Sequence, residues 1–249
     1  MFKNAVKEKL KAGEVVYGCF TPFLNADLVE FVAMQGFDYI VFEGEHGTLS
    51  PAQCTHLVRA ASMRGTTPIA RVPTNQPHII LQYLDTGIHG IHVPQVNSGA
   101  EAEQVIQSTK YFPRGSRGLA GTRAADYGMT MSLHDYTQQA NAETLTIVHV
   151  ETGAAVKCIH EFLAVDDLDV IFIGPTDLSQ SLGYTGQRDH PEVRRAIDDV
   201  IEAVLSSDKA LGIYVSSHEE ANYWRGRGIR YISCGLGTII KLGVASYLG

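Results

Sequence analysis

The chain has 249 residues, of which 45% are hydrophobic and 19% are charged, and its formal net charge is −7. This is the composition of an ordinary globular protein, and the length suits one domain spanning residues 1–249. The negative charge and the lack of a dense Lys/Arg run exclude nucleic acid as the main partner. No apolar stretch reaches the roughly 20 residues of a membrane span. The N-terminus has no apolar core for export, so we expect a cytoplasmic protein without a membrane partner.

Eight short apolar runs predict buried strands. They are nearly continuous in Val, Ile, Phe and Tyr, as expected for parallel strands that are covered on both faces. In chain order the predicted strands are Val15–Thr21, Asp38–Phe42, Pro68–Val72, Gly90–Pro94, Leu145–Val150, Asp169–Ile173, Leu211–Val215 and Arg230–Cys234.

Amphipathic stretches between these runs predict helices. An apolar stripe marks a helix within Asn25–Gln35, and Ser50 before Pro51 predicts the N-cap and first residue of a helix that runs to about Met63. Strand and helix alternate eight times, which predicts an α/β fold with one closed (β/α)8 TIM barrel. The alternative is a doubly wound open sheet. It is disfavoured because no glycine-rich dinucleotide loop follows the first strand.

The connection from Tyr111 to Thr130 is unusually long and is rich in Gly, Arg and small residues. It lies between the predicted fourth and fifth strands. Loops of this length are more often functional than not. Arg117 and Arg123 in this connection could bind a substrate carboxylate or could hold the loop in place, and both interpretations stay open.

Polar residues follow several predicted strands at the end of the barrel where active sites lie. Glu43–His46 follows the second strand, Arg71 ends the third, His149 and Glu151 end the fifth, and Asp177 follows the sixth. His149 and Glu151 are two residues apart and therefore point to the same side. Two neighbouring carboxylates repel unless a proton or cation lies between them, and Mg²⁺ or Mn²⁺ suits such a pair. Spacing alone leaves a metal site and a structural hydrogen-bonded pair equally open.

Five short segments that follow predicted strands or lie in the long connection form one pattern over nearly the whole chain. They are Glu43-Gly44-Glu45-His46, Arg71-Val72-Pro73, Tyr111-Phe112-Pro113-Arg114-Gly115-Ser116-Arg117-Gly118, Glu151-Thr152 and Gly174-Pro175-Thr176-Asp177-Leu178-Ser179. In this order they resemble the HpcH/HpaI family of metal-dependent class II pyruvate aldolases, such as 4-hydroxy-2-oxoheptanedioate and 2-keto-3-deoxy acid aldolases. The resemblance implies a barrel of the phosphoenolpyruvate/pyruvate type. It also implies reversible retro-aldol cleavage of a 4-hydroxy-2-oxo acid to pyruvate and an aldehyde through a metal-stabilised enolate.

The resemblance also implies roles for individual residues. His46 matches the family's base, and Arg71 matches the arginine that holds the substrate and stabilises the enolate. Glu151 and Asp177 match the two ligands of a divalent cation, which would be Mg²⁺, Mn²⁺ or Co²⁺. Asp85 matches an aspartate that raises the basicity of the histidine. The resemblance further implies a homo-oligomer, with a hexamer as the expected order.

Two further positions match substrate contacts of the family, and one of them departs from the family pattern. Thr176 and His149 occupy substrate-contacting positions, although the family usually has Gln in place of His149. It also usually has Asp in place of Glu43. The first departure bears on substrate preference and pH optimum, because a histidine can titrate near neutrality. The second bears on how the catalytic histidine is supported.

Other kinds of site are disfavoured by the positions of their residues. A Schiff-base aldolase needs an active-site lysine, but no lysine falls at the carboxyl end of a predicted strand, so we expect neither a Schiff base nor a nucleotide cofactor. His89 and His92 suggest a metal pair, yet they straddle a turn and a strand, which favours packing or a structural hydrogen bond.

Two rival functions remain open at this point. A metal-dependent decarboxylase or other lyase for a small 2-oxo acid would use the same site without an aldehyde pocket. A non-catalytic barrel that only binds a small acid would release no pyruvate. In each case the partner is a small molecule, and the physiological aldehyde is not specified by the sequence.

Overall fold

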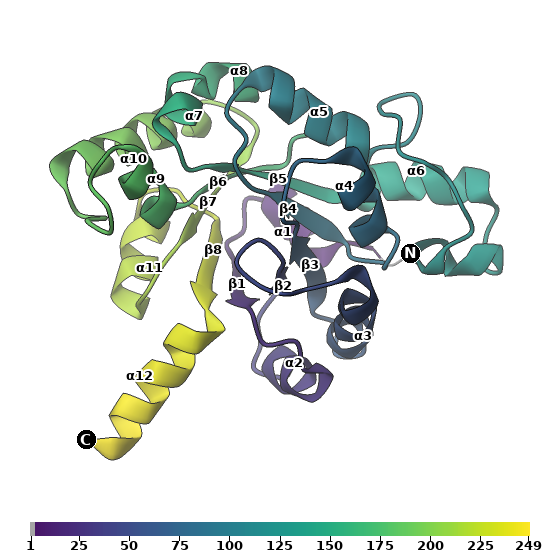
Figure 1. The fold of residues 1–249 in the computed structure, drawn as a ribbon, viewed down its shortest axis with the longest axis horizontal. Helices are drawn as coiled ribbons and strands as arrows, with labels where there is room; N and C mark the ends of the chain where they lie inside the picture. The colour runs from purple at the N-terminus through teal and green to yellow at the C-terminus, as the bar shows by residue number, and fades with distance from the viewer. Residues whose placement is uncertain (1–2) are drawn as a thin grey trace.

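Eight parallel strands close into a barrel in the computed structural model, which describes residues 3–249 (Figure 1). Each strand pairs in parallel with the next along the chain, and β8 pairs with β1. The (β/α)8 prediction is therefore confirmed. The strands are β1 (Val16–Thr21), β2 (Tyr39–Glu43), β3 (Thr67–Arg71), β4 (Gly90–Val93), β5 (Leu145–Val150), β6 (Val170–Ile173), β7 (Ala210–Tyr214) and β8 (Tyr231–Gly235).

All eight strands were predicted, and each strand end lies within one residue of its predicted position. The helix predicted after Ser50 is α3, which begins at Pro51. The Ser50 side chain accepts from the Gln53 N–H, and the Gln53 side chain accepts from the Ser50 N–H. This capping box satisfies donors that the first turn would otherwise leave unpaired.

Most of the helices surround the barrel on its outer side, and the last helix, α12, points away from it (Figure 1). The helices are α1 (Ala5–Lys11), α2 (Ala26–Ala33), α3 (Pro51–Ser62), α4 (Pro77–Leu84), α5 (Gly99–Thr109), η1 (Arg123–Gly128), α6 (Leu133–Glu143), α7 (Gly153–Lys157), α8 (Ile159–Leu163), α9 (Pro175–Ser181), α10 (Pro191–Leu205), α11 (His218–Gly226) and α12 (Leu236–Leu248). No helix within residues 3–249 is long and apolar enough to cross a bilayer.

The barrel separates two hydrophobic cores. Inward-facing strand residues such as Val41, Ile69 and Ile147 form the inner core, which α1 extends with Val6 and Leu10. Outward-facing strand residues pack against the surrounding helices and form the larger outer core. Because side chains alternate between the two faces of a strand, every strand except β4 contributes to both cores. This packing holds the carboxyl ends of the strands rigidly around one opening.

The long connection lies at the opposite end of the barrel, where the strands begin, because it joins the end of α5 to the start of β5. Arg117 donates to the Asp85 carboxylate at 2.8 Å, and its guanidinium lies 4.7 Å above the Tyr111 ring. Arg123 donates to the Thr86 carbonyl at 2.7 Å. Of the two interpretations left open, the structure supports the one in which these arginines hold the loop in place.

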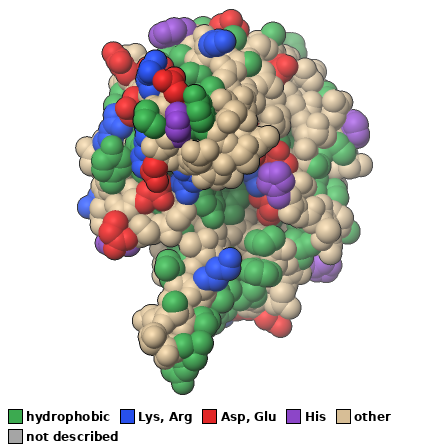
Figure 2. All heavy atoms as spheres, turned by 60° about the vertical axis from the view of Figure 1, so that its left-hand side comes forward, with side chains coloured by type: hydrophobic (Ala, Val, Ile, Leu, Met, Phe, Trp, Pro, Cys, Tyr) green, Lys and Arg blue, Asp and Glu red, His purple; other side chains and the backbone are tan. Residues whose placement is uncertain are grey.

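Helix α12 stands away from the barrel (Figure 1). Hydrophobic side chains run along it in the space-filling view (Figure 2), and Leu242, Tyr247 and Leu248 are 55%, 90% and 76% exposed. Beside its base lies an apolar groove of about 170 Å³, lined in part by Phe37 and Ile232. The last helix thus leaves apolar surface uncovered both on itself and on the barrel.

Candidate active site

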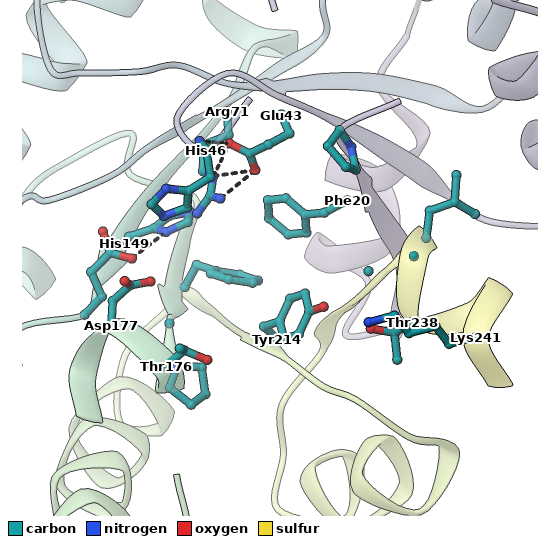
Figure 3. A pocket seen from close by; sticks show the side chains of 18 residues that line it. Phe20, Glu43, His46, Arg71, His149, Thr176, Asp177, Tyr214, Thr238 and Lys241 are labelled. Atoms are coloured by element: carbon teal, nitrogen blue, oxygen red, sulfur yellow. Dashed lines mark hydrogen bonds and ion pairs between the residues drawn. The ribbon is translucent and has the colours of Figure 1, made fainter. Parts of the chain in front are cut away.

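A cavity of about 480 Å³ opens at the carboxyl ends of the strands (Figure 3). Six of the seven residues predicted for the site line it, which are His46, Arg71, His149, Glu151, Thr176 and Asp177. They come from β2, β3, β5 and β6 or from the segments that directly follow these strands. The shared strand-end position is what brings them together.

Glu151 and Asp177 lie close together on one wall of this cavity. A Cβ built on Gly174 would lie 2.8 Å from Glu151 Oε2 and 3.8 Å from Asp177 Oδ2, so both carboxylates face the same small space. Glu151 is buried, whereas Asp177 is partly exposed and forms no hydrogen bond or ion pair with any described residue. Two acidic groups therefore converge on one wall of the cavity.

Glu151 is held at both of its oxygens. Oε1 accepts from the Gln95 N–H at 2.7 Å, and Oε2 contacts His149 Nδ1 at 3.0 Å. The Gln95 backbone adopts a left-handed conformation with φ of 55°, a strained conformation that is often found at functional sites. Although burial opposes ionisation, the contacts with His149, the Gln95 N–H and Arg71 lower the pKa of Glu151. Glu151 is therefore a fixed, ionised carboxylate.

This pair fits a hard divalent cation. Mg²⁺ is commonly bound by one or two carboxylates, with water and substrate oxygens completing its shell. Within residues 3–249 no group of three or more His, Cys, Asp and Glu side chains is arranged to hold a metal, so Glu151 and Asp177 are the two residues that could hold one here. The absence of a Cβ at Gly174 leaves open space beside both carboxylates.

Arg71 is clamped by two carboxylates. Its Nε and Nη2 atoms lie 2.8 and 2.5 Å from Glu43 Oε2, and its Nη1 atom lies 3.0 Å from Glu45 Oε2. The guanidinium carbon also lies 5.2 Å from the centre of the Phe20 ring. Arg71 keeps further N–H groups that these partners do not use, and it lines the cavity. The clamp fixes a delocalised cation close to the two acidic groups.

Glu43 also shapes the loop that carries His46. One oxygen of Glu43 accepts from the N–H groups of Glu45 and His46, at 2.7 and 2.9 Å. The His46 side chain is exposed at the cavity mouth, and no described residue forms a hydrogen bond with its ring. Figure 3 shows the ring beside Arg71 and above His149. Sequence analysis placed Glu43 at this end of the barrel and linked its departure from the family pattern to the support of His46; the structure shows that its side chain contacts both the His46 N–H and Arg71.

His149 and Thr176 line the cavity as well, but the two differ in what they offer a ligand. The hydroxyl-bearing side chain of Thr176 is exposed in the first turn of α9. Both ring nitrogens of His149 are already engaged, Nδ1 with Glu151 and Nε2 with His92 at 2.8 Å. His149 can therefore offer a substrate its ring face and C–H edge while its nitrogens bind protein.

Asp85 is the predicted residue that does not line the cavity. It lies at the C-cap of α4, at the end of the barrel where the strands begin, and binds Arg117. Helix α4 runs back along the barrel from the end of β3, which carries its last residue away from the active-site opening. Within one chain, Asp85 and His46 are therefore at opposite ends of the barrel, and the predicted support of the histidine is not formed there.

The cavity includes residues that the sequence analysis did not single out. Phe20, Phe172 and Tyr214 form an aromatic floor. The ring centroid of Phe20 lies 5.8 Å from that of Phe172 and 6.1 Å from that of Tyr214. Lys241, on α12, lines the wall opposite Asp177 (Figure 3). The alternation of side chains along β1 and β6 could have indicated that Phe20 and Phe172 line the cavity, because both lie on the inward face of their strands. Lys241 could not be found this way, since it follows the strand on a helix.

One pH effect follows from Glu45. Burial raises the pKa of Glu45 to about 7 from 4.5 despite Arg71, and Glu151 adds to the rise. The folded protein then keeps a proton that the unfolded chain releases near pH 4.5, so the free energy of unfolding falls as the pH rises from about 4.5 to about 7. We expect Glu45→Gln to remove this part of the pH dependence. Urea unfolding in EDTA at pH 5 and pH 8 measures it.

The exposed Glu14 serves as the matched control, because Glu14→Gln removes a carboxyl that is not buried. We expect the Glu14 variant to lose as much stability between pH 5 and pH 8 as the wild type does. If Glu45→Gln also loses the same amount, then Glu45 does not carry the raised pKa.

Comparison with known proteins identifies the family of the chain. A family model described as HpcH/HpaI aldolase/citrate lyase matches residues 16–240. The chain is 31% identical to 2-keto-3-deoxy-L-rhamnonate aldolase of Escherichia coli (strain K12), over 96% of the chain and 90% of that protein. It is 32% identical to 4-hydroxy-2-oxo-heptane-1,7-dioate aldolase of Escherichia coli (strain SE11), over 99% of the chain and 94% of that protein.

One solved structure matches the fold of this chain over nearly its whole length. The crystal structure of an HpcH/HpaI aldolase/citrate lyase family protein from Burkholderia cenocepacia J2315 superposes with a TM-score of 0.94 at 29% identity. The match covers 99% of this chain and 98% of that one. The resemblance seen in the five segments is confirmed. The chain is an enzyme of the lyase type and belongs to the HpcH/HpaI aldolase/citrate lyase family.

Proposed function

We propose that this protein is a class II pyruvate aldolase, which reversibly cleaves a 4-hydroxy-2-oxo acid into pyruvate and an aldehyde. The observation that carries the proposal is the pair Glu151 and Asp177, which face the same space beside Gly174. Arg71 and His46 line the same cavity. An acidic pair, a fixed cation and a histidine together supply what cleavage next to a 2-oxo group requires.

Glu151 and Asp177 would hold a divalent cation, which we propose to be Mg²⁺, Mn²⁺ or Co²⁺. When bound, the cation supplies Lewis-acid stabilisation of negative charge on an oxygen of the substrate. Asp177 has no competing partner among the described residues, and Glu151 is fixed at both oxygens. The protein therefore presents its two ligands ready for binding.

Arg71 would stabilise the enolate of pyruvate. Negative charge develops on the 2-oxo oxygen as the C3–C4 bond breaks, and preorganised donors aimed at such an oxygen lower the barrier. Glu43 and Glu45 hold the guanidinium from behind, so it needs no rearrangement during the reaction. The aromatic floor of Phe20, Phe172 and Tyr214 limits water around the developing charge.

His46 would act as the base that removes the proton from the C4 hydroxyl, directly or through a water. Its ring is exposed at the mouth of the cavity and is free of hydrogen bonds to the described residues. Thr176 would contact the bound 2-oxo acid from the neighbouring wall. The aldehyde portion would extend across the cavity toward Tyr214 and Lys241.

The role of His46 can be separated from that of the acidic pair. We expect His46→Ala to lower kcat by about 10²–10⁴-fold, the usual contribution of a general base, because proton removal is lost. Its Mn²⁺ affinity should stay within about 2-fold of the wild type, since His46 is not a proposed ligand. Kinetics and calorimetric titration measure the two effects. His56→Ala, which changes an exposed histidine on α3, is the control, and equal kinetics in the two variants would refute the role.

A panel of aldehydes tests the function. Pyruvate is incubated with succinate semialdehyde, glyceraldehyde-type and sugar-derived aldehydes, with Mn²⁺ or with EDTA, and products are measured by mass spectrometry. We expect carbon–carbon bond formation with at least one aldehyde, abolished by EDTA and restored by Mn²⁺. Oxaloacetate is assayed in parallel. Metal-dependent pyruvate release from oxaloacetate, with no product from any aldehyde, would favour the decarboxylase instead.

We further propose that the protein self-associates through α12. The exposed apolar residues of this helix and the apolar groove beside its base would be covered by a second copy. An assembly is also the arrangement in which Asp85 could reach a His46, that of another copy. The family resemblance suggests a hexamer.

This proposal predicts the mass in solution. We expect the wild type to elute as an oligomer and Leu242→Glu/Tyr247→Glu to elute at a lower mass, because two charges on the exposed face oppose its burial. Size-exclusion chromatography with light scattering measures both. Met63→Glu, at another exposed apolar residue, should keep the wild-type mass. A monomeric wild type would contradict the proposal.

A further inference from the structure

A chain of buried polar groups runs from the cavity into the interior of the barrel. It begins at Glu151 Oε2, which lies 3.0 Å from His149 Nδ1. His149 Nε2 lies 2.8 Å from His92 Nδ1, and His92 Nε2 lies 2.8 Å from the Tyr231 hydroxyl. All four side chains are at most 1% exposed. Strands β4, β5 and β8 each contribute a member, and His92 and Tyr231 lie outside the cavity lining.

The hydrogen bonds of this chain can be given a direction. Burial, together with the nearby His149 and Arg71, lowers the pKa of His92 well below 6.5, so this ring is neutral. Burial also raises the pKa of Tyr231 well above 10, so its hydroxyl keeps its proton. An ionised Glu151 accepts from His149 Nδ1–H. A Tyr231 hydroxyl that donates to His92 Nε2 leaves the single proton of the neutral His92 ring on Nδ1, which then donates to His149 Nε2.

The surroundings of His92 offer its ring nitrogens few other hydrogen-bond partners. Its ring meets the rings of Phe20 and Phe172 edge-on, at 5.3 and 5.1 Å between centroids. The adjoining inner core consists mainly of aliphatic and aromatic side chains. Burying polar groups in such a layer is costly unless each one is hydrogen-bonded. Removal of one member would therefore leave its neighbour without a partner.

We propose that His92 and Tyr231 are positioning residues for the metal site, which act through His149 to hold Glu151. The donor order places a proton on His149 Nδ1, the atom that faces Glu151. This donor and the Gln95 N–H together fix the carboxylate on both sides. The inference rests on the proposed function in that it takes Glu151 as a ligand of the divalent ion. Groups that orient a metal ligand in this way are typically worth about 10–100-fold in metal affinity.

The test compares two adjacent tyrosines. Tyr231 and Tyr39 are stacked with ring centroids 4.2 Å apart, and both are fully buried. The Tyr39 hydroxyl bonds to the Ile232 carbonyl and to Ser233, whereas that of Tyr231 bonds to His92. Tyr231→Phe and Tyr39→Phe thus each delete one buried hydroxyl from the same pair of interacting tyrosines, and only the first removes a member of the chain to Glu151.

Mn²⁺ affinity is measured by calorimetric titration of each full-length protein, with Tm recorded for each. We expect Tyr231→Phe to weaken Mn²⁺ binding by about 10-fold or more, while Tyr39→Phe stays within about 2-fold of the wild type. His92→Phe breaks the chain at a second point and should weaken binding at least as much. Equal Mn²⁺ affinity in Tyr231→Phe and Tyr39→Phe, with only Tm changed, would overturn the proposal.

A double-mutant cycle tests whether the effect passes through His149. His149→Phe removes both ring nitrogens and cuts the chain beside Glu151, so adding Tyr231→Phe to it should weaken Mn²⁺ binding no further. Additive losses would mean that Tyr231 acts by another route and would overturn the proposal. The proposed function fails separately, because a wild-type protein that binds no Mn²⁺ would refute the metal site before any variant is compared.

Discussion

Replacing Asp177 with asparagine is expected to weaken Mn²⁺ binding by at least about 100-fold and to lower kcat/KM by about 10³-fold or more. The first effect follows because one of the two proposed protein ligands loses its charge. The second follows because a bound cation contributes several kcal/mol of charge stabilisation, and each 1.36 kcal/mol is tenfold in rate. Calorimetric Mn²⁺ titration and steady-state kinetics with the best aldehyde of the panel measure the two quantities.

Asp208→Asn is the matched control, since the Asp208 side chain is 91% exposed and lies outside the cavity lining. It should retain wild-type affinity and kcat/KM. Glu151→Gln should behave like Asp177→Asn. A full complement of Mn²⁺ with wild-type affinity in both active-site variants would show that the acidic pair is not the metal site.

Arg71→Lys is expected to lower kcat by about 10²–10³-fold, the usual cost of losing one donor to a developing oxyanion. Lysine keeps the positive charge but lacks the planar fork that Glu43 and Glu45 grip. The substituted ammonium is therefore no longer held in place. Because Arg71 is not a proposed metal ligand, Mn²⁺ affinity should change by less than about 3-fold. The small change in Mn²⁺ affinity would distinguish the role of Arg71 from that of Asp177.

Arg114→Lys provides the control for Arg71→Lys, because Arg114 forms a similar two-point contact with Glu103, at 2.6 and 2.9 Å, outside the cavity. We expect its kcat to match that of the wild type. A loss in Arg71→Lys that appears in Mn²⁺ affinity instead of kcat would assign Arg71 to the metal site and remove it from enolate stabilisation.

The strands and the membership of the site followed from local patterns. Buried parallel strands are marked by continuous apolar runs, and their carboxyl ends share one opening, so residues such as Arg71, Glu151 and Asp177 could be grouped before their geometry was known. Spacing on β5 correctly placed His149 and Glu151 on one face. These inferences need only the period of a strand and the direction of the chain.

Other features depend on contacts between distant segments, which local patterns do not contain. The role of Glu43 in clamping Arg71 requires the side-chain direction at the ends of two strands. The sequence analysis favoured a structural hydrogen bond for His92, which the structure shows, but its partners His149 and Tyr231 come from two other strands. The distance between Asp85 and His46 follows from the course of α4, and the direction of α12 follows from packing that no sequence motif marks.

Exchange of the methyl protons of pyruvate in D₂O tests the central claim most directly, because it reports enolate formation without any knowledge of the aldehyde. We expect the enzyme with Mg²⁺, Mn²⁺ or Co²⁺ to remove the pyruvate methyl signal from the proton NMR spectrum, and EDTA to stop the exchange. Borohydride with pyruvate should leave the protein mass unchanged. Exchange that persists in EDTA, together with a trapped lysine adduct, would contradict the metal-dependent mechanism.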